Sequence, residues 1–188
     1  MDIRDWDERY RSGRRPLEDL EAPPNPLVIE TALDLKPGRA LDLACGSGRN
    51  TLWLAGRGWT VTAIDGSSTA IEILRGRAVA QRLDIDARLA DLQRDEYRIE
   101  ESAWDLIVIC FYLQRDLFTL AKRGLAKGGT LVAIAHISEP GEEPTDRRLK
   151  PGELREYFRG WKILHDREGK PSDPAHRRVS AEIVVRRP

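Results

Sequence analysis

The stretch Ala40-Leu41-Asp42-Leu43-Ala44-Cys45-Gly46-Ser47-Gly48-Arg49-Asn50 decides the fold of this chain. It is an apolar run of strand length that enters a glycine turn and then the start of a helix. Glycine lets the backbone come close to a ligand, and the N–H groups at a helix start can hold an anionic or polar group. Asp42 adds a carboxylate on the strand before the turn. Together these features predict a strand-turn-helix binding site.

The rest of the chain repeats the alternation of strand and helix. Apolar runs of strand length lie at residues 39–44, 59–64, 85–90, 106–110, 130–135, 161–165 and 179–185. Stretches of helical period lie between them, beginning with a helix that Asn25 caps and Pro37-Gly38 stops, and including residues 50–55 and a short helix at 152–158. This order predicts one doubly wound α/β domain over residues 1–188, with a mostly parallel sheet and helices on both faces.

Several local features refine this prediction. Thr69 and Glu72 match a capping box, so we expect Thr69 to cap the third helix. The run 85–90 alternates apolar and polar residues, which indicates a half-exposed strand near a sheet edge, whereas 106–110 and 130–135 are nearly unbroken apolar runs that belong mid-sheet. Gly128-Gly129 is expected to turn the chain into the strand at 130–135. The ligand of such a fold sits beyond the carboxyl ends of its strands.

Composition narrows the classes of function. Lys and Arg number 31 and Asp and Glu number 31, so no global positive field would attract nucleic acid. No window approaches a membrane span or a signal peptide, so we expect a cytoplasmic protein with no membrane partner. The two cysteines, Cys45 and Cys110, lack the close partners of a zinc site. We expect reduced, buried thiols and no metal.

Two further carboxylates follow strands at the ligand-bearing edge. Asp65 lies 19 residues after Gly46 (65 − 46), where nucleoside-binding α/β folds place an acid that accepts the ribose hydroxyls. The competing interpretation is a turn or helix-capping Asp. Asp91 ends the third strand and could accept a hydrogen bond from an adenine amino group, although a lone Asp there is also a common turn residue.

These motifs resemble the class I S-adenosylmethionine-dependent methyltransferases over nearly the whole chain, including residues 105–108 and 125–131. The resemblance implies the strand order 3-2-1-4-5-7-6 and S-adenosyl-L-methionine as cofactor. It implies that the turn with Asp42 holds the methionine end, Asp65 the ribose and Asp91 the adenine. The full set of expected cofactor residues is Asp42, Ala44, Cys45, Gly46, Gly48, Asn50, Asp65, Gly66, Ser67, Ala90, Asp91, Leu92 and Phe111. Ala44 is a departure, since many members have Gly there.

A narrower likeness is to the tellurite-resistance methyltransferases and their thiol- or thiopurine-methylating relatives. It is carried by residues 48–52, by Trp6-Asp7-Glu8-Arg9-Tyr10 and by residues 150–161. It implies a small-molecule acceptor, such as a thiol or a chalcogen. It also implies an N-terminal helical lid region at 1–36 with Trp6 and Tyr10, and a substrate-side loop with a short helix at 137–160. Helical packing explains the four-residue spacing of Trp6 and Tyr10 as well. We expect a monomer or a weak homodimer.

Methyl transfer from a sulfonium is an in-line displacement, so the protein mainly positions the acceptor and excludes water. A hydroxyl or amine acceptor would need a general base, whereas a soft nucleophile would not. His136 is the only histidine that this layout places at the ligand-bearing edge, so it is the candidate for a base or a substrate contact, with a structural role as the alternative. Phe111 and Tyr112 could wall the methyl pocket or simply pack against the next helix.

Two other functions remain open. A nicotinamide-dependent oxidoreductase shares the strand-glycine-helix turn, but Gly46-x-Gly48-x-x-Thr51 lacks the small third residue of that fingerprint, and the chain looks too short for a separate substrate domain. A non-catalytic module that binds S-adenosylmethionine would share every binding residue.

Overall fold

A computed structural model describes residues 3–12, 22–139, 141–142 and 145–188. These residues form two compact units, Met1–Arg98 and Ile99–Pro188. Parts of the two regions expected to lie over the substrate, residues 1–2 and 13–21 of the first and 140, 143 and 144 of the second, fall outside the described residues.

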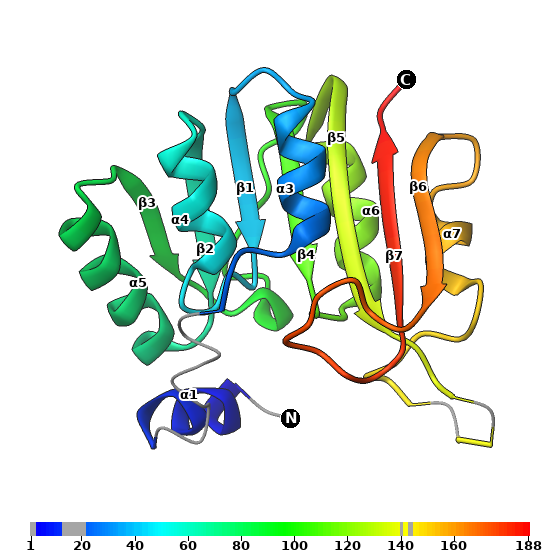
Figure 1. Ribbon diagram of the computed structural model, residues 1–188, viewed down its shortest axis with the longest axis horizontal. Coiled ribbons are helices and arrows are strands. Elements are labelled where there is room, and N and C mark those ends of the chain that lie inside the picture. Colours follow the sequence, from blue (N-terminus) through cyan, green and yellow to red (C-terminus); the bar gives the residue numbers. More distant parts are fainter. Residues whose placement is uncertain (1–2, 13–21, 140, 143–144) are drawn as a thin grey trace. The chain divides into compact units, whose positions relative to one another are not determined.

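The first unit is built on three parallel strands, β1 (Arg39–Leu43), β2 (Thr60–Asp65) and β3 (Ile85–Leu89). Its helices are α1 (Ile3–Arg11), α3 (Pro26–Leu33), α4 (Arg49–Gly56), α5 (Ser68–Gln81) and the short 3-10 helix η1 (Leu92–Arg94). Figure 1 shows the carboxyl ends of these strands pointing the same way, with α1 beyond them. The predicted strand-turn-helix order is therefore observed.

The core of this unit lies between α5 and the strands. Ile71, Leu74 and Ala78, the apolar stripe of α5, pack with Leu52, Ala63 and Ala87. Burial of such side chains contributes about 1.5–3 kcal/mol for each large aliphatic residue. In β3 only Ala87 is buried, and Leu89 is 54% exposed, which fits the expected edge strand.

The helix starts follow the sequence with one correction. Asn25 caps α3, because its side chain accepts a hydrogen bond from the Leu27 N–H. The cap of α5 is Ser67 and not Thr69, because the Ser67 hydroxyl accepts from the Ala70 N–H at 3.1 Å. The predicted cap at Thr69 is therefore wrong by two residues, and no capping box forms, because the third residue after Ser67 is Ala70. The helix α3 ends at Leu33, before the Pro-Gly pair expected to stop it.

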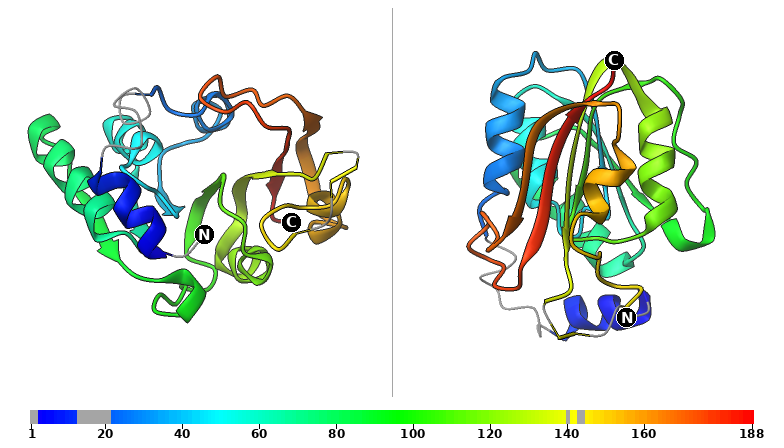
Figure 2. Two further views of the ribbon diagram at one scale, coloured as in Figure 1. Left: turned by 90° about the horizontal axis from the view of Figure 1, so that it is seen from below. Right: turned by 90° about the vertical axis from the view of Figure 1, so that its right-hand side faces the viewer.

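The second unit contains β4 (Trp104–Cys110), α6 (Arg115–Gly124), β5 (Leu125–His136), α7 (Glu153–Tyr157), β6 (Lys162–Gly169) and β7 (Ser180–Arg186). The right-hand view of Figure 2 shows α6 and α7 on the same face of this unit's strands. Arg115 of α6 and Glu153 of α7 form an ion pair at 2.6 Å that joins the two helices. The expected short helix is thus α7.

Gly128 and Gly129 do not turn the chain into a new strand, because β5 runs through them. The register of β4 and β5 shifts between Trp104 and Leu106, and Gly128 has a φ of +76°. A Cβ atom on Gly129 would lie 2.7 Å from the Trp104 carbonyl oxygen. The two glycines therefore allow an irregular and closely packed start of β5. A Gly-Gly pair is found both in turns and in such irregular strands, so the sequence alone did not distinguish them.

Among the described residues, seven strands follow the order β3-β2-β1-β4-β5-β7-β6, which confirms the order implied by the resemblance. The sheet is mixed, because β7 runs antiparallel to both β5 and β6. No helix in the part of the chain that the structure describes combines the length and apolar character needed to cross a membrane.

Candidate cofactor site

Asp65, at the carboxyl end of β2, is held by the glycine turn that follows β1. Its Oδ2 accepts a hydrogen bond from the Gly46 N–H, and its Oδ1 accepts one from the Ser67 N–H, both at 2.8 Å. The side chain is half-buried. The structure thus brings together the glycine turn and the second-strand acid, 19 residues apart. It also gives Asp65 the turn-forming role that was the competing interpretation.

Asp42 is a buried carboxylate below the turn. Its Oδ2 accepts a hydrogen bond at 2.6 Å from the Thr51 hydroxyl on the first turns of α4, and the side chains of both residues are inaccessible to solvent. Burial, reinforced by the nearby charge of Asp65, raises the pKa of Asp42 to about 7, against the opposing bond from Thr51. Thr51 was not predicted to be part of the site, although its position nine residues after Asp42, at the start of the next helix, offered a signal.

The backbone of the turn adopts left-handed conformations at Ala44, Gly46 and Gly48, with φ of +56°, +56° and +85°. Gly48 is the N-cap of α4, and a Cβ atom there would lie 2.2 Å from Leu74 Cδ1. Its observed role is close packing of α4 on α5. Ala44 bears a strain of about 1–2 kcal/mol that Gly would avoid.

The remaining turn residues have roles within the unit. Burial raises the pKa of the Cys45 thiol well above its ordinary value, which leaves it a poor nucleophile. Cys45 and Cys110 are thiols outside any disulfide in the described part of the chain, and both are half-buried rather than buried as expected. The Oδ1 of the buried Asn50 accepts from the Asn25 N–H at 2.9 Å, so this predicted cofactor residue also anchors the start of α3.

The segment after β3 meets the same turn. The Ala90 N–H donates to the Asp65 carbonyl at 3.0 Å, and Leu92 is buried. Asp91 caps η1, because its Oδ1 accepts from the Gln93 N–H at 2.9 Å. Arg94 lies 3.5 Å from the other oxygen. Asp91 therefore has the turn role considered from sequence, at the position where the adenine contact was expected.

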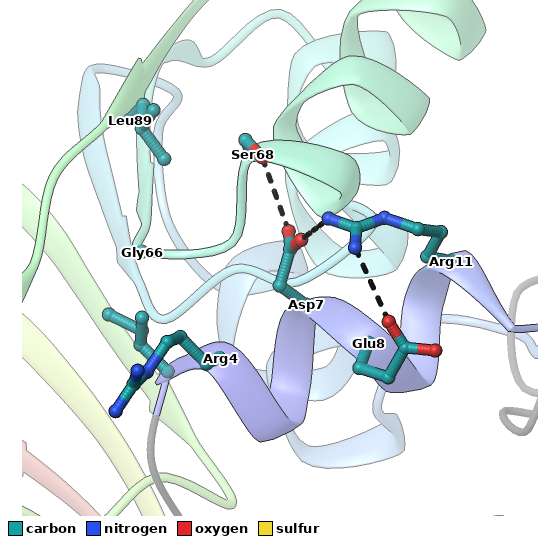
Figure 3. A pocket seen from close by; sticks show the side chains of 8 residues that line it. Arg4, Asp7, Glu8, Arg11, Gly66, Ser68 and Leu89 are labelled. Atoms are coloured by element: carbon teal, nitrogen blue, oxygen red, sulfur yellow. Dashed lines mark hydrogen bonds and ion pairs between the residues drawn. The ribbon is translucent and has the colours of Figure 1, made fainter.

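The helix α1 packs against this region from outside. Tyr10 is buried and Trp6 is half-buried beneath the Arg9 guanidinium. A pocket between α1 and the start of α5 is lined by Ile3, Arg4, Asp7, Glu8, Arg11, Gly66, Ser68 and Leu89 (Figure 3). A Cβ atom on Gly66 would lie 2.0 Å from Ile3 Cδ1. The absence of a side chain at Gly66 therefore admits α1.

In the second unit, an aromatic cluster stands at the carboxyl ends of β4 and β5. Phe111, with a φ of +56°, lies with its ring centroid 5.2 Å from that of His136. The ring of His176 stacks on Phe111 at 3.3 Å and lies 5.6 Å from His136. The expectation that His136 is the only histidine at this edge is therefore wrong, because the loop before β7 brings His176 beside it.

The environment of His136 favours its neutral form. Burial lowers the pKa of His136 against the opposing effect of the Val179 and Arg178 backbone, and the charges of Arg178 and Arg148 add to the lowering. Its Nδ1 is buried and has no hydrogen-bond partner among the residues that the structure describes. The half-buried Tyr112 donates its hydroxyl to the Gln114 side chain at 2.9 Å. Among the described residues, no group of three or more His, Cys, Asp or Glu side chains could hold a metal ion.

Comparison with solved structures identifies the class of this fold. The crystal structure of TehB from Haemophilus influenzae superposes with a TM-score of 0.74 at 27% identity, covering 86% of this chain and 61% of that one. The geranyl diphosphate C-methyltransferase of Streptomyces coelicolor, solved with S-adenosyl-L-homocysteine, superposes with a TM-score of 0.69 at 16% identity, covering 85% and 74%. The fold is that of the class I S-adenosylmethionine-dependent methyltransferases.

Comparison of sequences identifies the family. The family model described as tellurite resistance protein TehB matches residues 22–172, so the chain belongs to the TehB family. The probable S-adenosyl-L-methionine-dependent methyltransferase TehB of Haemophilus influenzae is 29% identical over 151 residues, which cover 75% of this chain and 52% of that protein. The chain thus spans about half the length of the curated relatives that it matches.

Proposed function

We propose that this protein is an S-adenosylmethionine-dependent methyltransferase that acts on a small acceptor carrying a soft nucleophilic atom, a thiolate or a reduced chalcogen. The observation that carries the proposal is the Asp65 carboxylate held by the Gly46 and Ser67 N–H groups at the ends of β1 and β2. Membership of the TehB family supports it.

The residues present fit this cofactor. In nucleoside-binding α/β folds, an acid at the end of the second strand accepts the ribose hydroxyls. The half-buried Asp65 carboxylate lies at that place, where the Gly46 and Ser67 N–H groups fix its orientation. When bound, S-adenosylmethionine supplies an electrophilic methyl group on its sulfonium.

We assign the methionine end of the cofactor, which carries an ammonium and a carboxylate group, to the turn that covers Asp42. A cation near Asp42 favours its ionised form and would offset the effect of burial on its pKa. The start of α4, after its N-cap Gly48, presents helix-start N–H groups to the carboxylate of the same end. The chain's own groups therefore match both charges of a zwitterion.

For the acceptor we assign the cluster of Phe111 and His136, because ligands of such sheets lie beyond the carboxyl ends of the strands. A thiolate attacks without proton removal, so the task left to protein groups is to orient the acceptor and exclude water. The neutral ring of His136 can donate or accept a hydrogen bond, and its Nδ1 is buried. Contact with an acceptor is therefore assigned to Nε2.

Calorimetry with S-adenosylhomocysteine tests the cofactor assignment. We expect saturable binding by the wild-type chain and a loss of about 1.5–3 kcal/mol of binding free energy in Asp65→Ala, the range for hydrogen bonds to charged groups. Asp84→Ala, which removes an exposed carboxylate of the same unit, is the matched control and should bind normally. Equal affinity of wild type and Asp65→Ala would refute the ribose assignment.

Turnover distinguishes the remaining functions. Methylation of a thiol or of reduced selenium or tellurium, followed by mass spectrometry of the product, is the expected result. Binding of S-adenosylhomocysteine without turnover on thiol, chalcogen, quinol or amine acceptors would indicate a non-catalytic module. A larger thermal stabilisation by NADH than by S-adenosylhomocysteine would indicate an oxidoreductase.

A further inference from the structure

The helix α1 supplies a carboxylate to the start of another helix. Asp7 Oδ1 accepts hydrogen bonds from the Ser67 hydroxyl at 2.8 Å, from the Thr69 N–H at 2.9 Å and from the Ser68 hydroxyl at 3.3 Å. Figure 3 shows Asp7 pointing from α1 toward Ser68 and the start of α5. A carboxylate at this place satisfies a free N–H group and interacts favourably with the helix dipole.

Ser67 connects this carboxylate to the ribose acid. Its N–H donates to Asp65 Oδ1 at 2.8 Å. Its hydroxyl donates to Asp7 and accepts from the Ala70 N–H at 3.1 Å. Both polar groups of this buried residue are thus engaged, one toward Asp65 and one toward Asp7. A displacement of Asp7 would therefore move Ser67 and change the position of the turn that holds Asp65.

Two further observations show that α1 is seated closely on this turn. Ile3 lies over Gly66, where a Cβ atom would come within 2.0 Å of its Cδ1. The second oxygen of Asp7 pairs with Arg11, one helical turn further along α1. The hydrogen bond from the Thr69 backbone holds the pKa of Asp7 below its ordinary value, so the carboxylate is ionised at neutral pH.

We propose that Asp7 is a positioning residue for the cofactor, which acts through Ser67 to hold the Asp65 turn in its binding conformation. The inference rests on the assignment of Asp65 to the ribose made above. Without Asp7, the Ser67 hydroxyl loses its acceptor and the first turn of α5 loses a capping carboxylate. Cofactor binding must then order the turn itself, which lowers the affinity.

Titration calorimetry with S-adenosylhomocysteine tests the proposal on the full chain. We expect Asp7→Ala to bind about fivefold more weakly than wild type, the factor that corresponds to the typical N-cap contribution of about 1 kcal/mol. Asp7→Asn keeps an acceptor oxygen in the same place and should restore most of the affinity. Equally weak binding by the two variants would overturn the hydrogen bond as the cause.

Glu8→Ala is the matched control. Glu8 is the next acidic residue of α1, and its side chain forms an exposed ion pair with Arg11 at 3.3 Å. The variant should bind S-adenosylhomocysteine with wild-type affinity. A loss equal to that of Asp7→Ala would mean that any weakening of α1 has the same effect, and the proposal for Asp7 would then be wrong.

Asp65→Ala separates failure of this proposal from failure of the proposed function. If Asp65→Ala loses affinity while Asp7→Ala binds like wild type, the ribose assignment stands and the role of Asp7 is refuted. If neither variant changes the affinity, the ribose assignment itself is refuted and the role of Asp7 falls with it.

Amide hydrogen exchange of the wild-type protein gives a second measurement, which does not depend on any variant folding correctly. Coupling between two sites is reciprocal, so S-adenosylhomocysteine should slow exchange in α1, residues 3–11, as well as in the turn at 65–69. The expected slowing in α1 is about fivefold, matching the affinity change. Slower exchange at the turn with no change in α1 would contradict the proposal.

Discussion

The Thr51 hydroxyl donates a 2.6 Å hydrogen bond to Asp42 Oδ2, which ties the first turns of α4 to the strand that precedes the glycine turn. Both side chains are buried, so the bond is the main compensation for placing a carboxyl group away from water. The pKa of Asp42 nevertheless rises to about 7. Folding therefore raises the pKa of Asp42 and favours its protonated form.

This pKa predicts a pH dependence of stability. The pKa of the carboxyl group is about 3.9 in the unfolded chain and about 7 in the folded protein. Between these two pH values the folded state therefore binds more protons than the unfolded state. The contribution of Asp42 to the free energy of unfolding is full below about pH 4 and falls as the pH rises through about 7, by up to about 4 kcal/mol. Urea titrations from pH 4 to 8 measure it.

Asp42→Asn should remove this slope, because the amide does not ionise and its oxygen can still accept from Thr51. We expect it to be more stable than wild type at pH 8 and nearly equal at pH 4. Asp84→Asn, at an exposed carboxyl group of the same unit, should keep the wild-type slope. An unchanged slope in Asp42→Asn would show that another group titrates.

Gly48→Ala should destabilise the protein through two effects. The residue has a φ of +85°, and the new Cβ would meet Leu74 Cδ1 at 2.2 Å. We expect a loss of about 2–5 kcal/mol of unfolding free energy, the sum of left-handed strain and overpacking. Gly160→Ala is the control, because its φ of +81° is similar and its surroundings are open.

The difference between these two glycine variants isolates the clash with Leu74. Urea unfolding measures it, and adding Leu74→Val to Gly48→Ala should recover part of the loss. Equal destabilisation by Gly48→Ala and Gly160→Ala would mean that backbone conformation alone requires glycine at position 48.

Ala44→Gly should stabilise the protein by about 1 kcal/mol, because Ala44 sits at a φ of +56°, where a Cβ atom is strained. Ala80→Gly, in the exposed last turn of α5, should show the opposite sign by a similar amount. Thermal unfolding compares the two. A destabilised Ala44→Gly would indicate that the Ala44 methyl makes packing contacts that outweigh the strain.

His136→Asn separates an orienting role from a general-base role. For a thiol acceptor we expect a higher KM with kcat nearly unchanged, because a thiolate needs no base. A base role would lower kcat by about 10²–10⁴-fold with hydroxyl or amine acceptors. His165→Asn, on β6 with a side chain 34% exposed, is the control. A large loss of kcat with thiols would contradict the orienting role.

Much of the fold was predictable from local patterns. The strand boundaries at 39–44, 85–90 and 179–185 agree with β1, β3 and β7 within a residue, because the apolar runs and glycine punctuation lie within each element. Asn25 was recognisable as a cap because its partner, the Leu27 N–H, is two residues away. The cap of α5 was misplaced because Ser67, Ser68 and Thr69 are chemically similar caps. Asp7, 60 residues from Ser67 in the sequence, also accepts hydrogen bonds at this helix start.

The candidate site divides in the same way. The carboxylates Asp42 and Asp65 follow from their places on strands, since parallel strands end at one edge. The bond from Thr51, the stacking of His176 on Phe111 and the packing role of Gly48 were not predictable, because each depends on a partner reached through a turn or a loop. Loop conformations carry no periodic signal, so a sequence pattern does not reveal which side chains they bring together.

By itself the sequence determined the order of strands and helices, the glycine turn and the acids at the strand ends, because periodicity and turn chemistry are local properties of the chain. Only the tertiary structure decided how those acids are used: Asp42 buried on Thr51, Asp65 held by two backbone N–H groups, and Asp7 seated on the start of α5. Hydrogen bonds and burial depend on distances between residues far apart in the chain, and these distances exist only once the chain has folded.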